Sequence, residues 1–175
     1  MNITGGKYKG RIIAAPDEKI TRPTLSKVRM GVFNTLYSML GSYEEKTFLD
    51  LFGGSGIIGL EALSRGFKDV LVFEKNPKAA HIIKRNYEAL GLTPNIRIGD
   101  SLKFLQNINE TFDVVYVDPP YSSGIYEEVF ANLYGKANLI IAEHSEDIMI
   151  DNFALIKTKN YGGKKVSFYA PKYMI

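Results

Sequence analysis

The stretch that most constrains the fold is residues 47–66, TFLDLFGGSGIIGLEALSRG. A short apolar segment, residues 47–51, runs into Gly-Gly-Ser-Gly at positions 53–56, and an apolar helix is expected to begin at Ile57. Glycines at such a turn adopt backbone angles that other residues resist and let a ligand approach main-chain atoms. The first N–H groups of the following helix have no intrahelical partner and can bind a polar ligand. The pattern predicts a strand, a glycine loop and a helix that together bind a nucleotide.

Two kinds of nucleotide enzyme are compatible with this loop. Residues 54–59, GSGIIG, satisfy the G-x-G-x-x-G pattern of dinucleotide-binding oxidoreductases. Asp50 argues against that class, because a carboxylate directly before the loop repels a pyrophosphate. The chain also has no room for a second domain that would hold a redox substrate. An acid at this position suits a cationic ligand with an amino-acid part, which describes S-adenosylmethionine, and a methyltransferase is the favoured interpretation. A tight turn with a purely structural role is the third alternative.

Length and composition indicate one ordinary globular domain. The chain has 175 residues, enough for a full core, and its 45% apolar and 23% charged content is typical of globular proteins. No apolar run approaches the length of a membrane span, no signal peptide is visible, and a cytoplasmic location is expected. With no cysteine, and with His81 and His144 far apart, no metal site is expected.

Basic residues are concentrated near the N-terminus. Residues 1–30 contain seven basic and two acidic side chains, a net charge of +5, whereas the remaining 15 basic and 17 acidic side chains give −2. This asymmetry indicates a polyanionic partner bound at one end, although a merely solvated basic face is the alternative. The expected RNA contacts are Lys7, Lys9, Arg11, Arg22, Lys27 and Arg29.

The basic N-terminal segment is expected to form a β-hairpin over residues 3–13. Lys7, Lys9 and Arg11 alternate along it, so they would share one face of an extended strand and could contact a phosphate backbone. Lysines that only protect an edge strand from aggregation are the alternative explanation.

The rest of the chain alternates between helices and strands. Thr24 is expected to cap a helix that ends near Gly41. Strands are then expected at 47–51, 69–74, 95–99, 111–117 and 138–142, with helices at 57–65, 77–90, 102–108 and 124–134 between them and a closing hairpin at 153–158 and 165–169. This alternation predicts an α/β fold with a mostly parallel sheet.

Acidic residues end three successive predicted strands. Asp50, Glu74 and Asp100 would therefore lie together at the carboxyl edge of the sheet, where α/β proteins bind ligands. Glu74, at the tip of the second strand, is placed to accept hydrogen bonds from ribose hydroxyls. Asp100 could accept a hydrogen bond from an adenine amino group, and it is equally possible that Asp100 or Ser101 only caps the next helix.

The fourth predicted strand ends in Asp118-Pro119-Pro120-Tyr121. Two prolines exclude both helix and ladder pairing, so this tetrapeptide is expected to form a rigid loop. Asp118 and the Pro119 carbonyl can accept both N–H groups of an exocyclic amine while Tyr121 stacks on the ring. The motif predicts a site for a planar, amine-bearing nucleobase, and a plain proline turn is the alternative.

Five motifs together resemble the RsmD family, bacterial enzymes that methylate the N2 amino group of one guanine in 16S ribosomal RNA. The resemblance covers nearly the whole chain. The motifs are GGKYKGR (5–11), R-P-T-x-x-x-V-R-x-x-x-F-N (22–34), DLFGGSG (50–56), EALSRG (61–66) and, about 65 residues after the glycine loop, DPPY (118–121).

The resemblance implies a Rossmann-like class I methyltransferase with a seven-stranded, mostly parallel sheet, helices on both faces and an N-terminal β-hairpin. One domain is expected, with residues 1–22 as a basic extension and 23–175 as the catalytic core. Cofactor-binding residues would be Asp50, Phe52, Gly53, Gly54, Ser55, Gly56, Glu74, Lys75, Asp100, Ser101 and Thr24, and the target base would be held by Asp118, Pro119, Pro120 and Tyr121.

The implied activity is S-adenosylmethionine-dependent methylation of guanine N2, at position 966 by the family's rRNA numbering. The implied partner is 16S rRNA, within an assembling small subunit, and the enzyme is expected to be a monomer. Methylation of an adenine N6 in DNA or RNA is an alternative. A dinucleotide-dependent oxidoreductase and a non-catalytic RNA-binding domain are two further ones.

Overall fold

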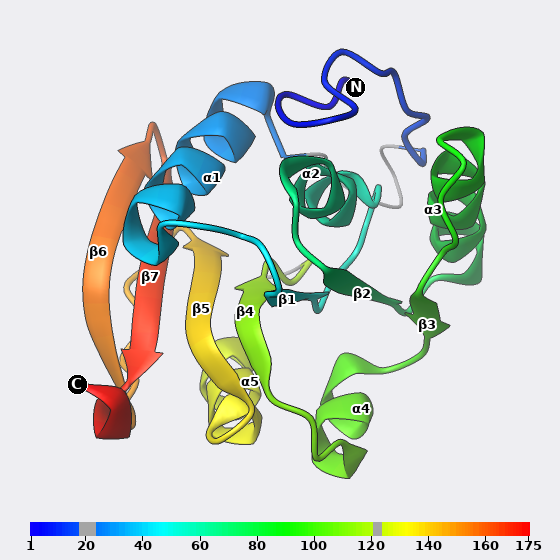
Figure 1. Ribbon diagram of the computed structural model, residues 1–175. Coiled ribbons are helices and arrows are strands. Elements are labelled where there is room, and N and C mark those ends of the chain that lie inside the picture. Colours follow the sequence, from blue (N-terminus) through cyan, green and yellow to red (C-terminus); the bar gives the residue numbers. More distant parts are fainter. Residues whose placement is uncertain (18–23, 121–123) are drawn as a thin grey trace.

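The computed structural model describes residues 1–17, 24–120 and 124–175, and these form one α/β unit around a single sheet (Figure 1). In chain order the elements are α1 (Ser26–Leu40), β1 (Thr47–Asp50), α2 (Ile57–Arg65), β2 (Asp69–Glu74), α3 (Pro77–Ala89), β3 (Ile96–Ile98), α4 (Ser101–Asn107), β4 (Phe112–Val117), α5 (Ile125–Leu133), β5 (Ala137–His144), β6 (Phe153–Tyr161), β7 (Lys164–Pro171) and a 3-10 turn at Lys172–Met174.

The sheet order in the described residues is β3-β2-β1-β4-β5-β7-β6. The first five strands are parallel, whereas β7 pairs antiparallel with both β5 and β6. The chain leaves β1 toward β2 and β3, then crosses to β4 and β5 on the other side. That reversal creates a switch point at the carboxyl ends of β1 and β4, where open α/β sheets bind their ligands.

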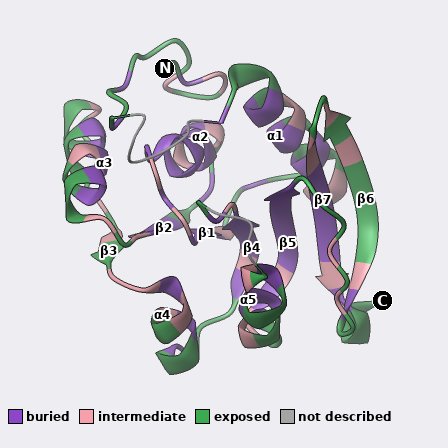
Figure 2. Cartoon of the chain, turned by 180° about the vertical axis from the view of Figure 1, so that it is seen from behind, coloured by how far each residue is buried: buried purple, intermediate pink, exposed green. Residues whose placement is uncertain are grey.

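Helices cover both faces of the sheet, and each face has its own apolar core (Figure 2). Helices α1, α2 and α3 pack on one face over residues such as Phe48, Val72 and Ile141. Helices α4 and α5 pack on the other face over residues such as Leu49, Val115 and Ile140. Alternate residues of the central strands therefore point into opposite cores, as expected for a parallel sheet buried on both sides.

The predicted α/β fold, its seven-stranded mixed sheet and its two helical layers are confirmed. The bounds of α2 and β2 are as predicted, whereas β5 extends through His144 and the two hairpin strands are longer than expected. The prediction that Thr24 caps the first helix is wrong. The N-cap position of α1 is Leu25, and no side chain caps it.

The N-terminal segment is not the regular hairpin that alternation of its charges suggested. A single antiparallel bridge joins Asn2 and Ile12, and residues 5–10 between them are turns and bends. Because the segment is not extended, Lys7, Lys9 and Arg11 do not share one strand face.

Among the described residues, none of the helices combines the length and the apolar character that a membrane span requires.

Candidate active site

The glycine loop follows β1 at the switch point and is packed tightly against β2 and α3. A Cβ atom on Gly53 would lie 2.5 Å from Cγ1 of Val72, and one on Gly56 would lie 2.8 Å from Cγ2 of Ile83. Gly56 also has a φ of 80°, a left-handed conformation that favours glycine. These two glycines are thus required by the packing of the fold itself, in addition to any ligand they admit.

Asp50 ends β1 beneath this loop as a buried carboxylate with an unused oxygen. Its residue is 2% exposed, and its Oδ2 atom has no hydrogen-bond partner among the described residues. Burial raises the pKa of Asp50 to about 7, the backbone N–H of Phe52 opposes that rise, and the carboxylates of Glu74 and Glu143 add to it. A buried acceptor left unsatisfied is costly, so this atom indicates a missing donor.

Glu74 connects the glycine loop to the start of α3. Its Oε2 accepts a hydrogen bond from the Gly54 N–H at 2.6 Å, and its Oε1 accepts one from the Asn76 N–H at 3.0 Å. Asn76 in turn caps α3 by accepting hydrogen bonds from Lys78 and Ala79. Glu74 is therefore fixed at the carboxyl edge, and each oxygen keeps a second lone pair for a ligand hydroxyl.

The third strand end carries Asp100 and Ser101, and both make the contacts of a helix start. Asp100 Oδ1 accepts a hydrogen bond from the Lys103 N–H at 3.0 Å, which makes Asp100 the N-cap of α4. The Ser101 hydroxyl donates to the Leu51 carbonyl at 2.7 Å and so links α4 to the end of β1. Asp100 thus caps α4 as expected, and both residues lie at the same edge as Glu74.

The DPP sequence follows β4, next to the glycine loop in the sheet order. Asp118 is partly buried, Pro119 is buried and Pro120 is exposed. Tyr121, predicted to stack on a base, lies outside the described residues. Burial raises the pKa of Asp118 well above its ordinary value, the neighbouring Glu143 carboxyl raises it further, and Lys164 opposes the rise.

Glu143 is a residue that sequence reasoning missed. It lies on β5. Because Val117 of β4 is in register with Ala142 of β5, the next residues of the two strands, Asp118 and Glu143, are neighbours. Its side chain is buried, and Oε2 accepts a hydrogen bond from Lys164 Nζ at 2.7 Å. Oε1 accepts from the Tyr116 hydroxyl and, at 3.3 Å, from Thr24 Oγ1. The signal that could have found it is the acid at the end of an apolar run, as for Asp50.

The surroundings of Thr24 and Arg29 differ from those that the sequence predicted. Thr24 is buried at the carboxyl edge and contacts Glu143, so it borders the site although it caps no helix. Arg29, predicted to face RNA, is 1% exposed and forms an ion pair with Glu61 at 3.3 Å. The expectation that Arg29 contacts RNA is wrong, because its guanidinium group is enclosed. Lys27 is exposed, and Arg22 lies outside the described residues.

The exposed basic residues of the N-terminal segment lie away from the glycine loop. The Lys7 N–H donates to the Ser64 carbonyl at 2.7 Å, near the end of α2 and roughly two helical turns from its start. The Arg11 guanidinium donates to the Ala89 carbonyl, at the end of α3, at 3.4 Å. The segment therefore covers the ends of α2 and α3 that are remote from the site (Figure 1).

Glu61, in the EALSRG motif, attaches this segment to the core. The side chain is fully buried, and Oε1 accepts hydrogen bonds from the Thr4 N–H at 2.6 Å and the Thr4 hydroxyl at 2.7 Å. The same carboxylate pairs with Arg29 and, at 3.1 Å, with Arg65. The Arg29 guanidinium also donates to the carbonyls of Asn2 and Thr24.

We expect Glu61→Ala to destabilise the fold by about 3–5 kcal/mol, because it leaves the buried Arg29 charge without its partner. Urea unfolding followed by circular dichroism measures this change. The matched control is Glu45→Ala, which removes an exposed ion pair with Lys68 and should have little effect. Equal unfolding free energies for the two variants would contradict the role assigned to Glu61.

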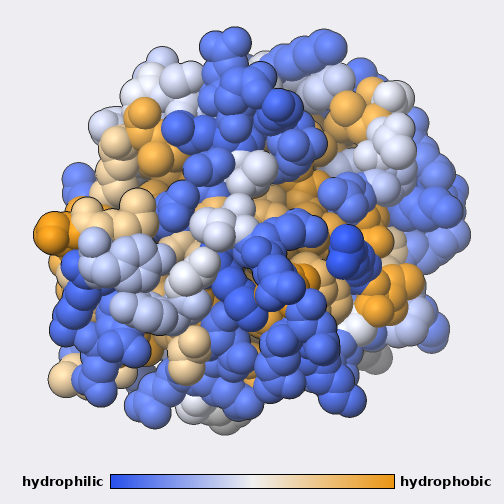
Figure 3. Space-filling view, turned by 60° about the horizontal axis from the view of Figure 1, so that its bottom comes forward, coloured by the Kyte–Doolittle hydropathy of each residue, from blue (hydrophilic) through white to orange (hydrophobic). Residues whose placement is uncertain are grey.

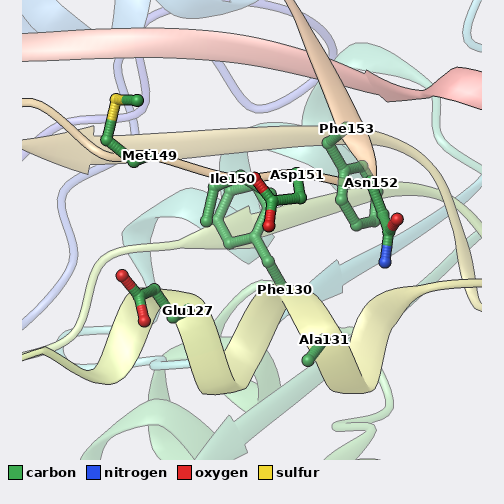
Figure 4. A pocket seen from close by; sticks show the side chains of 8 residues that line it. All are labelled: Glu127, Phe130, Ala131, Met149, Ile150, Asp151, Asn152 and Phe153. Carbon is green, nitrogen blue, oxygen red and sulfur yellow. The ribbon is translucent and has the colours of Figure 1, made fainter.

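Two hollows formed by described residues contain none of the predicted site residues. One is lined by α5 and residues 149–153, with the Phe130 ring and the Asp151 carboxylate directed toward it (Figure 4). Another lies at the opposite edge of the sheet, between α1, β6 and the C-terminal turn. Apolar side chains on the face of Figure 3 are interspersed with hydrophilic ones. The carboxyl edge of β1, β4 and β5 therefore remains the candidate site.

Comparisons with known proteins show the family of the chain. The family model described as "Conserved hypothetical protein 95" matches residues 1–170. The Haemophilus influenzae protein named ribosomal RNA small subunit methyltransferase D is 32% identical over 93% of this chain and 89% of its own length. Its counterpart from Buchnera aphidicola, strain APS, is 31% identical over 97% and 82%, respectively.

Solved structures lead to the same class. The structure titled "Putative methyltransferase yhhF from Escherichia coli" superposes with a TM-score of 0.85 at 27% identity, over 98% of this chain and 97% of that one. The structure titled "putative methylase HI0767 from Haemophilus influenzae" superposes with a TM-score of 0.77 at 29% identity, over 97% of both chains. The fold and the site define a Rossmann-like methyltransferase. Within that class, the chain belongs to the RsmD family.

Proposed function

We propose that this protein transfers a methyl group from S-adenosylmethionine to the exocyclic N2 amine of a guanine in small-subunit ribosomal RNA. The observation that carries the proposal is the unpaired Oδ2 atom of Asp50, buried beside the glycine loop. The α-ammonium group of S-adenosylmethionine is a donor of the kind that this atom lacks. The names of the relatives supply the substrate class, since they are methyltransferases of ribosomal small-subunit RNA.

The described residues fit such a cofactor. Asp50 would hold its ammonium group, Glu74 its ribose hydroxyls and Asp100 its adenine amino group. The remaining contacts would come from Phe52, Gly53, Gly54, Ser55, Gly56, Lys75, Ser101 and Thr24. When bound, the cofactor supplies a methyl group on a positively charged sulfur, which an amine lone pair can attack.

The DPP loop would orient the amine. Asp118 and the Pro119 carbonyl each accept one N–H, so the nitrogen lone pair points away from them and toward the methyl donor. Such alignment can supply roughly 7–11 kcal/mol in favourable cases. Pro120 stiffens the loop, and Tyr121 is proposed to hold the plane of a base splayed out of the RNA. The methylated amine must lose one proton, and Asp118 and Glu143 are the titratable groups beside it.

Lys7, Lys9, Arg11, Arg22 and Lys27 are proposed to contact the RNA backbone. Guanine N2, at position 966, is the acceptor that the RsmD resemblance implies, in the RNA of an assembling subunit. A monomer that acts in the cytoplasm fits this role.

The proposal is tested by incubating the protein with tritiated S-adenosylmethionine and small-subunit rRNA from a strain that lacks the enzyme. We expect label in RNA and N2-methylguanosine in the digested nucleosides, located by mass mapping. Label in N6-methyladenosine would favour the alternative acceptor. RNA binding without transfer would indicate a non-catalytic domain, and NADH binding without S-adenosylmethionine binding would indicate an oxidoreductase.

A further inference from the structure

The turn between β6 and β7 lies at the carboxyl edge of the sheet, where β5 separates β7 from the strand that ends in the DPP loop. Because β7 runs antiparallel to β5, its first residues pair with the last residues of β5, with Lys165 opposite His144. Tyr161 and Lys164 close the hairpin on either side of Gly162-Gly163. Figure 1 shows this turn extending past the ends of β4 and β5 alongside α1.

Two contacts hold the turn in place. Lys164 Nζ lies 2.7 Å from Glu143 Oε2, the carboxylate next to Asp118. On the other side, the Tyr161 hydroxyl packs against Gly31 of α1, where a Cβ atom would clash with it. The turn is thus fixed between α1 and the end of β5, in the immediate surroundings of the proposed target base.

The turn and the strand before it are strongly basic. Residues 157–165, KTKNYGGKK, contain four lysines and no acid. Lys157 and Lys159 pair with Phe168 and Val166, which point into the core under α1, so these two lysines project on that face of the sheet. Lys165 faces the other side and pairs with Asp147 at 2.8 Å.

Helix α1 adds a further charge to the same region. Lys27 is exposed and lies one helical turn before Gly31, so it is on the side of α1 that Tyr161 contacts. Lys27, Lys157 and Lys159 therefore lie on the α1 side of the hairpin, with Lys164, paired with Glu143, at its turn; we call these four residues the hairpin surface. The N-terminal cations Lys7 and Arg11 lie instead at the remote ends of α2 and α3.

We propose that the hairpin surface binds the phosphate backbone of the substrate RNA next to the target nucleotide. This inference rests on the proposed function, because it names where that substrate lies. Lysines contact phosphates without reading sequence, so the surface would position the strand whose base enters the DPP loop. Positive charge on two separated regions, the hairpin surface and the N-terminal segment, fits a structured RNA that spans both.

The test uses the double variant Lys157→Glu/Lys159→Glu in the full-length protein. We expect the KM for rRNA to rise about tenfold or more, and the slope of log affinity against log salt to become shallower by about 2, one for each lost phosphate contact. The affinity for S-adenosylmethionine and kcat at saturating RNA should stay unchanged. Lys172→Glu is the matched control, an exposed lysine just after β7 at the opposite edge of the sheet.

RNA affinity is measured by fluorescence anisotropy as well as by turnover, so the two proposals can fail separately. If the wild-type protein binds rRNA but transfers no methyl group, the proposed activity is wrong, and the anisotropy slopes still decide the role of the hairpin. If the double variant and Lys172→Glu have the same KM and the same salt slope as the wild type, the hairpin surface does not bind RNA.

Discussion

Asp118→Ala is expected to lower kcat by about 10²- to 10³-fold while leaving the affinity for S-adenosylmethionine nearly intact. This is the size of effect seen when an enzyme loses one preorganised group that acts on the reacting atoms. Asp118 follows β4 beside the proposed target base, whereas most of the proposed cofactor contacts lie at the ends of β1, β2 and β3 and in the glycine loop. Single-turnover transfer of label measures the effect, and calorimetry measures cofactor affinity.

The fold should tolerate this substitution. Burial and the Glu143 carboxyl raise the pKa of Asp118, so the native structure opposes its ionised form and gains little from it. Asp69→Ala, at the exposed start of β2, serves as the control for a lost carboxylate. Turnover by Asp118→Ala close to that of the control would refute the proposed hold on the amine.

Asp50→Asn is expected to weaken binding of S-adenosylmethionine by about 10- to 100-fold, the effect of losing a hydrogen bond between charged groups of about 1.5–3 kcal/mol. The substitution should also remove the pH dependence of S-adenosylmethionine binding. In the free protein the pKa of Asp50 is about 7, so below that pH the carboxyl must lose a proton before it can pair with the ammonium group. The affinity of the wild-type protein for the cofactor should therefore fall as the pH drops below 7, and the loss should approach tenfold for each pH unit.

Calorimetric titrations between pH 5 and pH 7 test this dependence, a range in which an α-amino group, of ordinary pKa about 8, stays protonated.

The stability of the protein should change with pH in the opposite direction. Folding raises the pKa of Asp50 from 3.8 to about 7, so the native state binds the proton more tightly and the free energy of unfolding falls as pH rises through that range. At pH 8 the Asn variant should be the more stable protein. An unchanged pH profile of affinity in Asp50→Asn would exclude Asp50 as the ligand.

The residues whose positions in the fold were predicted correctly from sequence are those that local chemistry places. The glycine loop and the acids that end β1 and β2 occupy short segments whose backbone course follows from their own residues. Glu143 was missed because its importance comes from the register between β4 and β5, which places it beside Asp118. Tertiary pairing of this kind leaves little trace in a single sequence.

The two errors near the N-terminus have a related cause. Arg29 was expected to face solvent because a charge off the apolar stripe of a helix usually does, yet Glu61 on α2 supplies a buried partner. The alternation of Lys7, Lys9 and Arg11 suggested a strand. Instead, backbone N–H groups between Asn2 and Ile12 donate hydrogen bonds to Ser64 and Glu61, and these contacts determine the course of the segment. In both cases a contact with α2 overrides the local pattern.

That attachment has a consequence for hydrogen exchange. The amides of Thr4, Lys7 and Tyr8 donate to Glu61 Oε1, the Ser64 carbonyl and Ser64 Oγ at 2.6–2.9 Å, so their protons are shielded although the segment contains no regular strand. They should exchange with deuterium only when α2 separates from the segment, and therefore at rates like those of the helix. An irregular terminus would then share the protection of the core and would resist proteolysis with it.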